Sequence, residues 1–481
     1  MNAKYNEYYA FALSFDTIFI LRYSVLLLPT TCQPLLKTLY IIPQNLYCII
    51  IHGLVYSSSY TQIWFQHYSY IIPAFLQGIG VIIMDYRIET DFIGDRKIPV
   101  DAYYGINAIR GHENFDISTD KADHTLIKTM AWVKKACALA NFDSGKMEKE
   151  MAHAISDACD GLATGKYDDQ FIVNPIQGGA GTSFNMNANE VIANIVLEML
   201  GHRKGEYEIV DPLMHINLSQ STNDVYPTAI SLALVLKLEP FLKSLCAARD
   251  SLLAKSLDLE SAMKMGRTHL NAAVPMSFGQ SFNAYAALLT RDNDRVSAAM
   301  DGLRRVPLGG TIIGTEYKTT PEYRKAVIDR LREISCLSIE VCANLADGIQ
   351  NVDVYSDLSA TLRTCALNLS KIASDLRLLG SDRGYGIGEL TLSPRQLGSS
   401  IIVTKINPVM AELINQVAFL VCGYDQSISM AANAGQLELN VFKPIIVYSL
   451  FRSIDIMASA LDKFNEYCLQ AEIIVHNRGR E

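Results

Sequence analysis

The sequence predicts a mainly α-helical protein, an elongated bundle of long helices with a small N-terminal domain. The clearest support is the segment 352–379, which contains neither glycine nor proline. Its apolar residues recur at alternating steps of four and three. They therefore form one stripe along a helix of roughly 40 Å. Segment 278–303 repeats this spacing and carries polar residues on much of its other side. Two such amphipathic segments indicate a helical bundle.

Three further segments are expected to form long helices, namely 228–257, 409–432 and 441–468. Pro240 is expected to bend the first of them, because proline removes a helical hydrogen bond and clashes with the preceding turn. Several of these helices are apolar on more than one side, as in 230–238. A single slender bundle could not bury so much apolar surface, so we expect a homo-oligomer.

Composition divides the chain into four parts. An apolar extension, 1–84, precedes an N-terminal domain, 85–220, which is followed by a central bundle of long helices, 221–470, and a short tail, 471–481. In 85–115, aspartate, glycine and proline residues punctuate brief pieces that are expected to be extended. The small N-terminal domain is therefore expected to begin with extended structure.

The first 84 residues are rich in tyrosine, isoleucine and leucine and carry very few charges. Three apolar runs, 9–30, 38–58 and 70–84, are interrupted by charged or helix-breaking residues or are short for a membrane span of about 20 residues. No basic stretch with one apolar core and a small-residue cleavage site is present, so a signal peptide fits poorly. We interpret the segment as a non-homologous extension that a wrongly chosen start site would explain; a membrane anchor is the alternative.

The charge and the cysteines limit the classes of partner. The net charge is -8 and no run of lysine or arginine occurs, which argues against nucleic acid, because phosphate binding needs concentrated positive charge. A small molecule is the expected partner. Ten cysteines are scattered without the spacing of metal ligands. We therefore expect a reducing, cytoplasmic compartment, no structural metal, and membrane association only if the first 84 residues belong to the protein.

Four segments are dense in glycine and small polar residues: 178–190, 219–224, 266–270 and 398–408. Each is interpreted as a loop that leads towards the start of a helix. Hydroxyl, amide and backbone N–H groups at helix N-termini suit a carboxylate ligand, and Lys405 adds a positive charge. Helix capping is the alternative for each segment, because serine, threonine, asparagine and aspartate prefer that position.

Taken together and in this order, the four segments resemble the signature segments of the aspartase/fumarase superfamily. The similarity runs from about residue 87 to residue 466, and its most specific piece is Gly398-Ser-Ser followed by Lys405-x-Asn-Pro-Val. Narrower features resemble aspartases more than fumarases. They lie in the segments 101–105, 113–118, 177–182 and 435–440.

The resemblance implies a carbon–nitrogen lyase, which reversibly eliminates ammonia from L-aspartate to give fumarate without an organic cofactor. It also implies a homotetramer whose active sites are each assembled from three subunits. The proton at C3 of aspartate is weakly acidic. It becomes removable when the carbanion delocalises into the adjacent carboxylate, which forms a doubly charged aci-carboxylate that preorganised donors must stabilise.

By position in the family's motifs, Ser399 is the expected general base. A serine hydroxyl is a poor base, so its alkoxide needs loop N–H donors and a neighbouring positive charge, for which Lys405 is the nearest candidate in sequence. The resemblance also assigns the residues that hold the β-carboxylate, where negative charge accumulates. These are Ser400, Thr182, Ser221 and Thr222.

The same resemblance places Lys405 and Asn407 on the α-carboxylate of the substrate, with Thr268 close by. This grip would orient the C–N bond for elimination. Asn223 and His269 would address the amino group.

Glu412 matches the family's glutamate that pairs with this histidine. The pairing would orient His269 and favour its charged form. In a chain without this family context, the histidine would be interpreted as a structural residue.

The sequence also departs from the family's pattern. In the serine loop, β-branched residues at 401–404 replace a segment with proline, which is expected to impair closure over the substrate. Glu316 replaces a glycine and is expected to bring a negative charge towards a dianionic substrate. Relatives continue past residue 481 into a small C-terminal domain, which we expect to be absent. The alternatives to an active aspartase are a fumarase-type hydro-lyase and a non-catalytic or partial aspartase paralogue.

Overall fold

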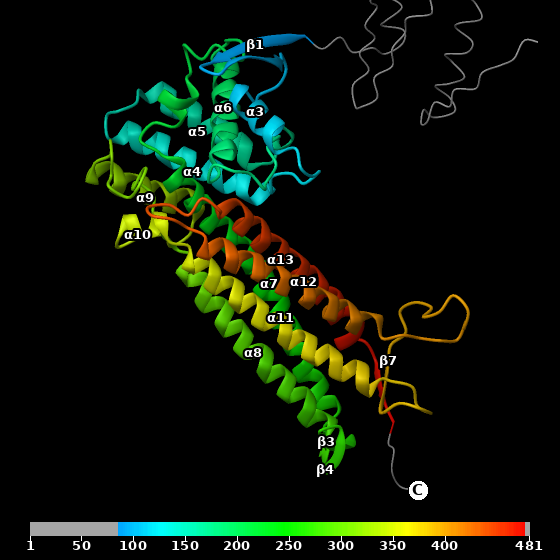
Figure 1. The fold of residues 1–481 in the computed structure, drawn as a ribbon. Helices are drawn as coiled ribbons and strands as arrows, with labels where there is room; N and C mark the ends of the chain where they lie inside the picture. Colours follow the sequence, from blue (N-terminus) through cyan, green and yellow to red (C-terminus); the bar gives the residue numbers. More distant parts are fainter. Residues whose placement is uncertain (1–84, 477–481) are drawn as a thin grey trace, which may run out of the picture. The chain divides into compact units, whose positions relative to one another are not determined.

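The computed structural model describes residues 85–476 (Figure 1). The predictions for the extension 1–84, and for residues 477–481 of the predicted tail, lie outside the described residues. The described part is mainly helical, and its strands form four small two-stranded sheets. The predicted fold class, an elongated bundle of long helices with a small N-terminal domain, is confirmed.

The described chain begins with an antiparallel hairpin of strands β1 (Tyr86–Asp91) and β2 (Gly94–Pro99). The expectation of extended structure in 85–115 holds for this hairpin, but the next element is helix α3 (Ile106–Phe115). No side chain of its own N-terminal turn caps this helix. Its N–H groups are accepted instead by Glu190 Oε2, at 3.0 Å from the Ala108 nitrogen, and by a second buried glutamate. Because the caps come from distant residues, no local pattern predicts α3.

Four further helices and one short turn complete the N-terminal part. They are α4 (His124–Asp143), α5 (Lys149–Ala163), η2 (Asp168–Gln170), α6 (Thr182–Met199) and the π-helical η3 (Pro212–Ile216). Helices α4, α5 and α6 pack against one another, and α4 also packs against α7 of the bundle.

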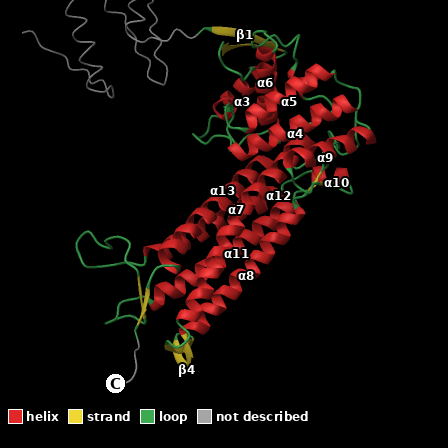
Figure 2. Cartoon of the chain, turned by 180° about the vertical axis from the view of Figure 1, so that it is seen from behind, coloured by secondary structure: helices red, strands yellow, loops and turns green. Residues whose placement is uncertain are grey.

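The five predicted long helices are all present and run side by side (Figures 1 and 2). They are α7 (Thr222–Asp258), α8 (Phe278–Gly302), α11 (Asp353–Leu379), α12 (Val409–Asn433) and α13 (Lys443–Phe464). Helix α7 packs against α8 and α13, and α11 packs against α8 and α12. With 37 residues, α7 is about 55 Å long, and it sets the length of the bundle.

Short elements connect the long helices. They are the parallel pair β5 (Arg305–Val306) and β6 (Glu340–Val341), helices α9 (Pro321–Ser335) and α10 (Leu345–Gln350), the π-helical η4 (Asn465–Leu469), and the antiparallel pair β7 (Leu390–Leu392) and β8 (Ile473–Val475). The last pair brings the end of the described chain back beside the segment that precedes α12.

The segment 266–270 corrects one prediction. It is not a loop that leads to a helix start, because it forms the end of strand β3 (Met263–Thr268) and the turn into strand β4 (Asn271–Ser277). The two turn residues, His269 and Leu270, have φ values of 54° and 62°. Such a turn usually contains asparagine or glycine, so its sequence signal is missing here.

One described helical stretch, Lys443–Leu469, is long and apolar enough to cross a membrane, with a mean hydropathy of 1.4. In this fold 61% of its most apolar part is buried. A helix in the core of a soluble protein has the same length and composition. Its packing against α7 and α12 therefore accounts for its apolar character.

Candidate active site

The N-terminal turns of helices α6 and α7 lie against each other. Thr182 is the first residue of α6 and follows Gly181, whose φ of 92° is left-handed. One turn later, Asn185 Nδ2 donates to Thr222 Oγ1 at 3.1 Å. The N–H groups of Thr182 and Asn223 are already accepted by the Gly179 carbonyl and by Ser221 Oγ, but the two helix N-termini bring the positive ends of two helix dipoles together, which suits a carboxylate. Two of the predicted polar segments are thus brought together.

Ser221 is the N-cap of α7 and forms a capping box with Asp224. Ser221 Oγ accepts a hydrogen bond from the Asn223 N–H at 3.2 Å, and the Ser221 N–H donates to Asp224 Oδ1 at 2.9 Å. Asn223 Nδ2 donates to the Ile312 carbonyl at 2.8 Å. The capping alternative is therefore realised for Ser221, whose hydroxyl still has its own proton to donate to a ligand.

A buried lysine holds the turn that precedes α7. Lys134 on α4 is fully buried, and its ammonium donates to Asn217 Oδ1 at 2.9 Å and to Gln220 Oε1 at 2.8 Å. Burial lowers the pKa of Lys134 to about 7. Both partners are neutral amides in the turn that leads into α7. The only sequence signal for this residue is a lysine pair within an otherwise apolar helix, which more often marks a solvated face.

The loop before α12 presents the hydroxyl of Ser399. Ser399 Oγ accepts hydrogen bonds from the N–H groups of Ile401 at 3.2 Å and Ile402 at 2.9 Å. Two N–H donors on one oxygen stabilise negative charge on that oxygen. The local geometry of the loop therefore fits the loop N–H donors that a serine base requires.

The base of the same loop is closed by its own backbone. The Gly398 N–H donates to the Lys405 carbonyl at 2.8 Å, and Asn407 Nδ2 donates to the Gly398 carbonyl at 2.9 Å. A Cβ atom at residue 398 would lie 2.8 Å from Asn407 Cγ, so the closure requires glycine. The side chains of Ser400 and Lys405 are exposed and make no hydrogen bond or ion pair within residues 85–476.

Thr268 and His269 lie at the tip of the β3–β4 hairpin, and both residues are exposed. The preceding residue, Arg267, anchors the hairpin by donating to Glu389 Oε1 at 2.7 Å and Oε2 at 2.9 Å. Among the described residues, the His269 ring has no hydrogen-bond partner. The tip is therefore held in place with its imidazole available to a ligand or to another chain.

The expected pairing of Glu412 with His269 does not occur within one chain. Glu412 Oε1 lies 3.8 Å from Arg377 Nε on the neighbouring helix α11. The family motif indicates which residue types pair, but it does not show that they come from the same chain. The pairing stays a prediction about residues of different chains.

The predicted site residues of one chain lie at opposite ends of the bundle (Figure 1). Thr182 and the segment 221–223 lie where α6 and α7 begin. The hairpin with His269 follows the other end of α7, about 55 Å away along the helix. The Ser399 loop precedes α12 and lies towards that same far end (Figure 1). No single chain brings all of these groups together.

Comparison with known proteins decides the family. Residues 94–423 match a family model described as "Lyase". The chain is 48% identical to the aspartate ammonia-lyase of Bacillus subtilis over 386 residues, 80% of this chain and 81% of the relative. The chain belongs to the aspartase/fumarase family of lyases.

Further relatives and solved structures support the same family. It is 42% identical to the aspartate ammonia-lyase of Escherichia coli, over 80% of this chain and 81% of the relative. A fumarate lyase/delta crystallin structure from Brucella melitensis, solved with cobalt, has a TM-score of 0.80 and 42% identity, over 81% of this chain and 85% of that chain. A class II fumarase structure from Schistosoma mansoni has a TM-score of 0.79 and 28% identity, over 81% of this chain and 85% of that chain.

The replacement of a glycine by Glu316 has a local compensation in this lyase. The carboxylate of Glu316 forms an ion pair with Arg324 of α9. An opposite charge at contact distance reduces the field that the carboxylate extends into its surroundings. The expected repulsion of a dianionic substrate stays a prediction, and residue 316 has a left-handed φ of 58°.

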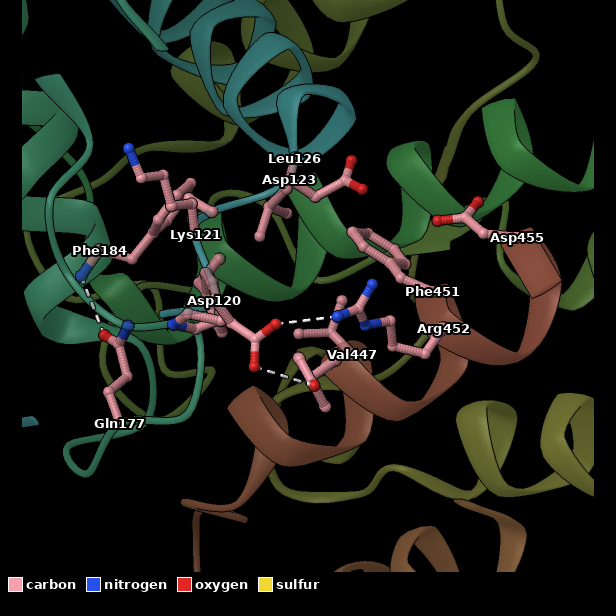
Figure 3. A pocket seen from close by; sticks show the side chains of 14 residues that line it. Asp120, Lys121, Asp123, Leu126, Gln177, Phe184, Val447, Phe451, Arg452 and Asp455 are labelled. Atoms are coloured by element: carbon pink, nitrogen blue, oxygen red, sulfur yellow. Dashed lines mark hydrogen bonds and ion pairs between the residues drawn. The ribbon is translucent and has the colours of Figure 1, made fainter. Parts of the chain in front are cut away.

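A cavity of 170 Å³ separates the N-terminal part of the lyase from α13 (Figure 3). In its wall, Arg452 Nη2 donates a hydrogen bond to Asp120 Oδ1 at 2.8 Å. None of the predicted site residues lines this cavity. Its link with the site is the loop before α6, because Gln177 Oε1 accepts from the Phe184 N–H at 3.0 Å and both residues line the wall.

Proposed function

We propose that this lyase catalyses the reversible elimination of ammonia from L-aspartate to give fumarate. The observation that carries the proposal is the 42–48% identity to aspartate ammonia-lyases of several bacteria, over about 80% of the chain. The site residues expected from the family's motifs support the proposal through their local geometry. The reaction requires no organic cofactor.

In the proposed reaction the Ser399 alkoxide takes the proton from C3 of L-aspartate. The electron pair of the broken C–H bond delocalises into the β-carboxylate as an aci-carboxylate. It then forms the C2–C3 double bond while ammonia leaves C2. The two loop N–H groups on Ser399 Oγ, from Ile401 and Ile402, support the assignment because they stabilise the alkoxide before proton transfer.

The β-carboxylate gains charge during the reaction and therefore needs the strongest donors. We assign it to the N-terminal turns of α6 and α7, with Thr182, Ser221 and Thr222, and to Ser400 of the serine loop. The adjoining helix N-termini support this assignment, because they bring two positive dipole ends to one place beside these hydroxyl groups. Lys134 fixes the turn before α7 from the buried side, through its hydrogen bonds to Asn217 and Gln220.

The remaining groups of the substrate are assigned to residues of the loop and the hairpin. Lys405 and Asn407, with Thr268, hold the α-carboxylate, and Asn223 and His269 address the amino group. The side chains of Lys405 and His269 support these assignments, because both are exposed and neither has a hydrogen-bond or ion-pair partner in the described part of the chain. In this arrangement the C–N bond is held for elimination by groups on both sides of C2.

The active form is proposed to be a homotetramer in which three chains contribute to each site. Two observations support shared sites. The site residues of one chain lie at opposite ends of the bundle, and the outer side of α12 carries exposed apolar side chains. Phe419 is 68% exposed, Leu420 is 43% exposed and Met430 is 65% exposed. Apolar surface on a long helix is typically covered by another subunit.

We place the enzyme in the cytoplasm. The described residues include eight cysteines as free thiols. Four of them, Cys137, Cys159, Cys365 and Cys468, are buried among apolar side chains. A thiol in such a position behaves as a small apolar residue, which fits a reducing compartment.

The test is fumarate formation, followed by ultraviolet absorbance, when the purified full-length protein is mixed with L-aspartate or with L-malate. Ser399→Ala is the variant that removes the proposed base. Ser393→Ala is the matched control, because Ser393 lies in the same connecting segment and its hydroxyl, as far as the described residues show, bonds only to the Glu472 carbonyl, at 2.8 Å. The proposal predicts fumarate from L-aspartate with the wild type and the control, and a rate at least about a hundredfold lower with Ser399→Ala.

Other results would replace the proposal. Fumarate from L-malate alone would identify a fumarase-type hydro-lyase. No product from either substrate, in a sample whose tetrameric state is verified by light scattering, would identify a non-catalytic relative. A rate in Ser399→Ala close to that of the wild type would remove Ser399 as the base and leave the lyase activity standing.

A further inference from the structure

Asp224 makes contacts that its place in a capping box does not explain. The residue is fully buried at the third position of α7. Oδ1 accepts from the Ser221 N–H at 2.9 Å, which completes the capping box. Oδ2 accepts from the N–H groups of Gly309 at 3.1 Å and Thr311 at 3.0 Å. The carboxylate thus joins the start of α7 to a loop more than 80 residues away in sequence.

This loop needs such an anchor because its backbone is strained. Gly309 has a φ of 91°, and the non-glycine residues Thr311 and Glu316 have φ values of 59° and 58°. A left-handed φ is unfavourable for a non-glycine residue, because its Cβ atom comes too close to the following carbonyl oxygen. The loop is held against α7 by the Asp224 carboxylate and by the bond from Asn223 Nδ2 to the Ile312 carbonyl.

We propose that Asp224 is a positioning residue of the active site: its carboxylate locks the loop 309–312 onto the first turn of α7 and thereby sets the positions of Ser221 and Asn223. The inference rests on the proposed function, in which these two residues bind L-aspartate. Asp224 does not touch the substrate in this arrangement. It acts through the Ser221 N–H and through the loop that accepts from Asn223.

The lock requires a carboxylate because three N–H donors converge on its two oxygens. An asparagine has only one acceptor oxygen, and its NH₂ group is a donor. Its NH₂ group would therefore face either the Ser221 N–H or the two loop N–H groups, which would lose their acceptor. A buried donor without an acceptor is unstable, and the loop or the capping box would move to reach water. Asp224→Asn therefore changes the site while almost conserving the volume of the side chain.

The lock is also expected to respond to pH. Burial raises the pKa of Asp224 to about 6. The charged and titratable groups that face it are Lys134 and Cys137 on α4 and Tyr323 on α9; residues 309–312 of the facing loop contain no titratable side chain, and Glu316 further along the loop is paired with Arg324. Above pH 6 the ionised form accepts all three bonds. Below pH 6 the protonated form directs an O–H towards N–H donors, so the lock loosens and substrate binding weakens.

The experiment compares steady-state kinetics of the full-length wild type, Asp224→Asn and a matched control, Asp292→Asn, as a function of pH. Asp292 is also a buried carboxylate, but it lies within the bundle and bonds to Asn368 at 2.8 Å and to Arg295. For Asp224→Asn we expect KM for L-aspartate to rise about tenfold to a hundredfold, with a smaller change in kcat. The acid limb of kcat/KM near pH 6 should disappear, because asparagine does not titrate there.

A second measurement covers the case in which Asp224→Asn does not fold. Amide hydrogen exchange in the wild type, corrected for the intrinsic effect of pH, should show protection of the Gly309 and Thr311 N–H groups at pH 7.5 that is lost at pH 5. Equal protection at both values would overturn the lock. So would an Asp224→Asn enzyme with the KM and pH profile of the wild type or of Asp292→Asn. A wild type that turns over no L-aspartate would refute the proposed function instead, and the exchange result would still decide the lock.

Discussion

Activity restored by mixing two inactive variants would test whether the sites are shared between chains. Ser399→Ala removes the proposed base, and Asn223→Ala removes a proposed contact to the amino group. In one chain these residues belong to opposite ends of the bundle, which α7 alone extends over about 55 Å. If each site takes its Ser399 loop and its Asn223 from different chains, a hybrid tetramer contains some sites that lack neither group.

The expected recovery follows from symmetry. Loss of a general acid or base lowers the rate about 100- to 10 000-fold, so the Ser399→Ala homotetramer is almost inactive, and Asn223→Ala is expected to be strongly impaired as well. In a random one-to-one hybrid, one half of the positions that supply Ser399 are intact and one half of those that supply Asn223 are intact. Over all randomly mixed tetramers about one quarter of the sites are then complete, and removal of the homotetramers by the two tags raises the expected rate to about 30% of the wild-type rate.

The assay uses co-expressed variants that carry different affinity tags, sequential purification on both tags, and fumarate absorbance. A hybrid of Ser399→Ala with Lys405→Ala is the control, because both residues belong to the same loop of the same chain. Every site of that hybrid receives an altered loop, from one variant or the other. The hybrid should therefore recover no more activity than its parents. Verified hybrids of Ser399→Ala with Asn223→Ala that stay as inactive as their parents would refute the shared site.

The remaining predictions concern stability and one loop residue. Burial lowers the pKa of Lys443 to about 8, from an ordinary 10.5. The folded state therefore binds this proton more weakly than the unfolded state, and the wild type should gain up to about 3 kcal/mol over Lys443→Met as pH rises from 8 to 10.5. Urea unfolding at both pH values checks this, and a constant difference would contradict it. Glu316→Gly should change KM for L-aspartate less than about twofold, because Arg324 already offsets the charge; a tenfold fall in KM would show that the carboxylate reaches the substrate. Leu362→Ala should cost about 2–5 kcal/mol in urea unfolding, because Leu362 is 1% exposed in the stripe of α11; a loss below about 1 kcal/mol would contradict the packing.

The long helices could be predicted because their signal is local and repeated. The stripe on 352–379 predicts α11 to within one residue, since each apolar residue faces the core one helical turn after the last. Helix α7 begins at Thr222, six residues before the expected start at 228, because Pro227 lies inside the helix rather than before it. The Ser221 and Asp224 capping box marks that start in the sequence.

The elements that sequence patterns did not predict depend on distant residues. Helix α3 is capped by Glu89 and Glu190, which lie 17 and more than 80 residues away from the N–H groups they accept. The β3–β4 hairpin turns through His269 and Leu270, residue types that give no turn signal. The sequence around Lys134 gives no sign that the residue is buried; its burial results from the packing of α4 against α7.

The sequence by itself determined the family, the bundle of long helices and the identity of the candidate site residues, because periodicity and motifs are properties of neighbouring positions. Only the tertiary structure decided where those residues lie. It placed Ser221 and Ser399 towards opposite ends of one chain, paired Glu412 with Arg377, and joined Asp224 to the loop 309–312. The physical reason for the separation is that helix α7, with 37 residues, is rigid and lies between groups that the family's motifs assign to one site. The physical reason for the link is that the buried Asp224 carboxylate must be hydrogen-bonded, and its partners lie in a segment that shares no local sequence pattern with α7.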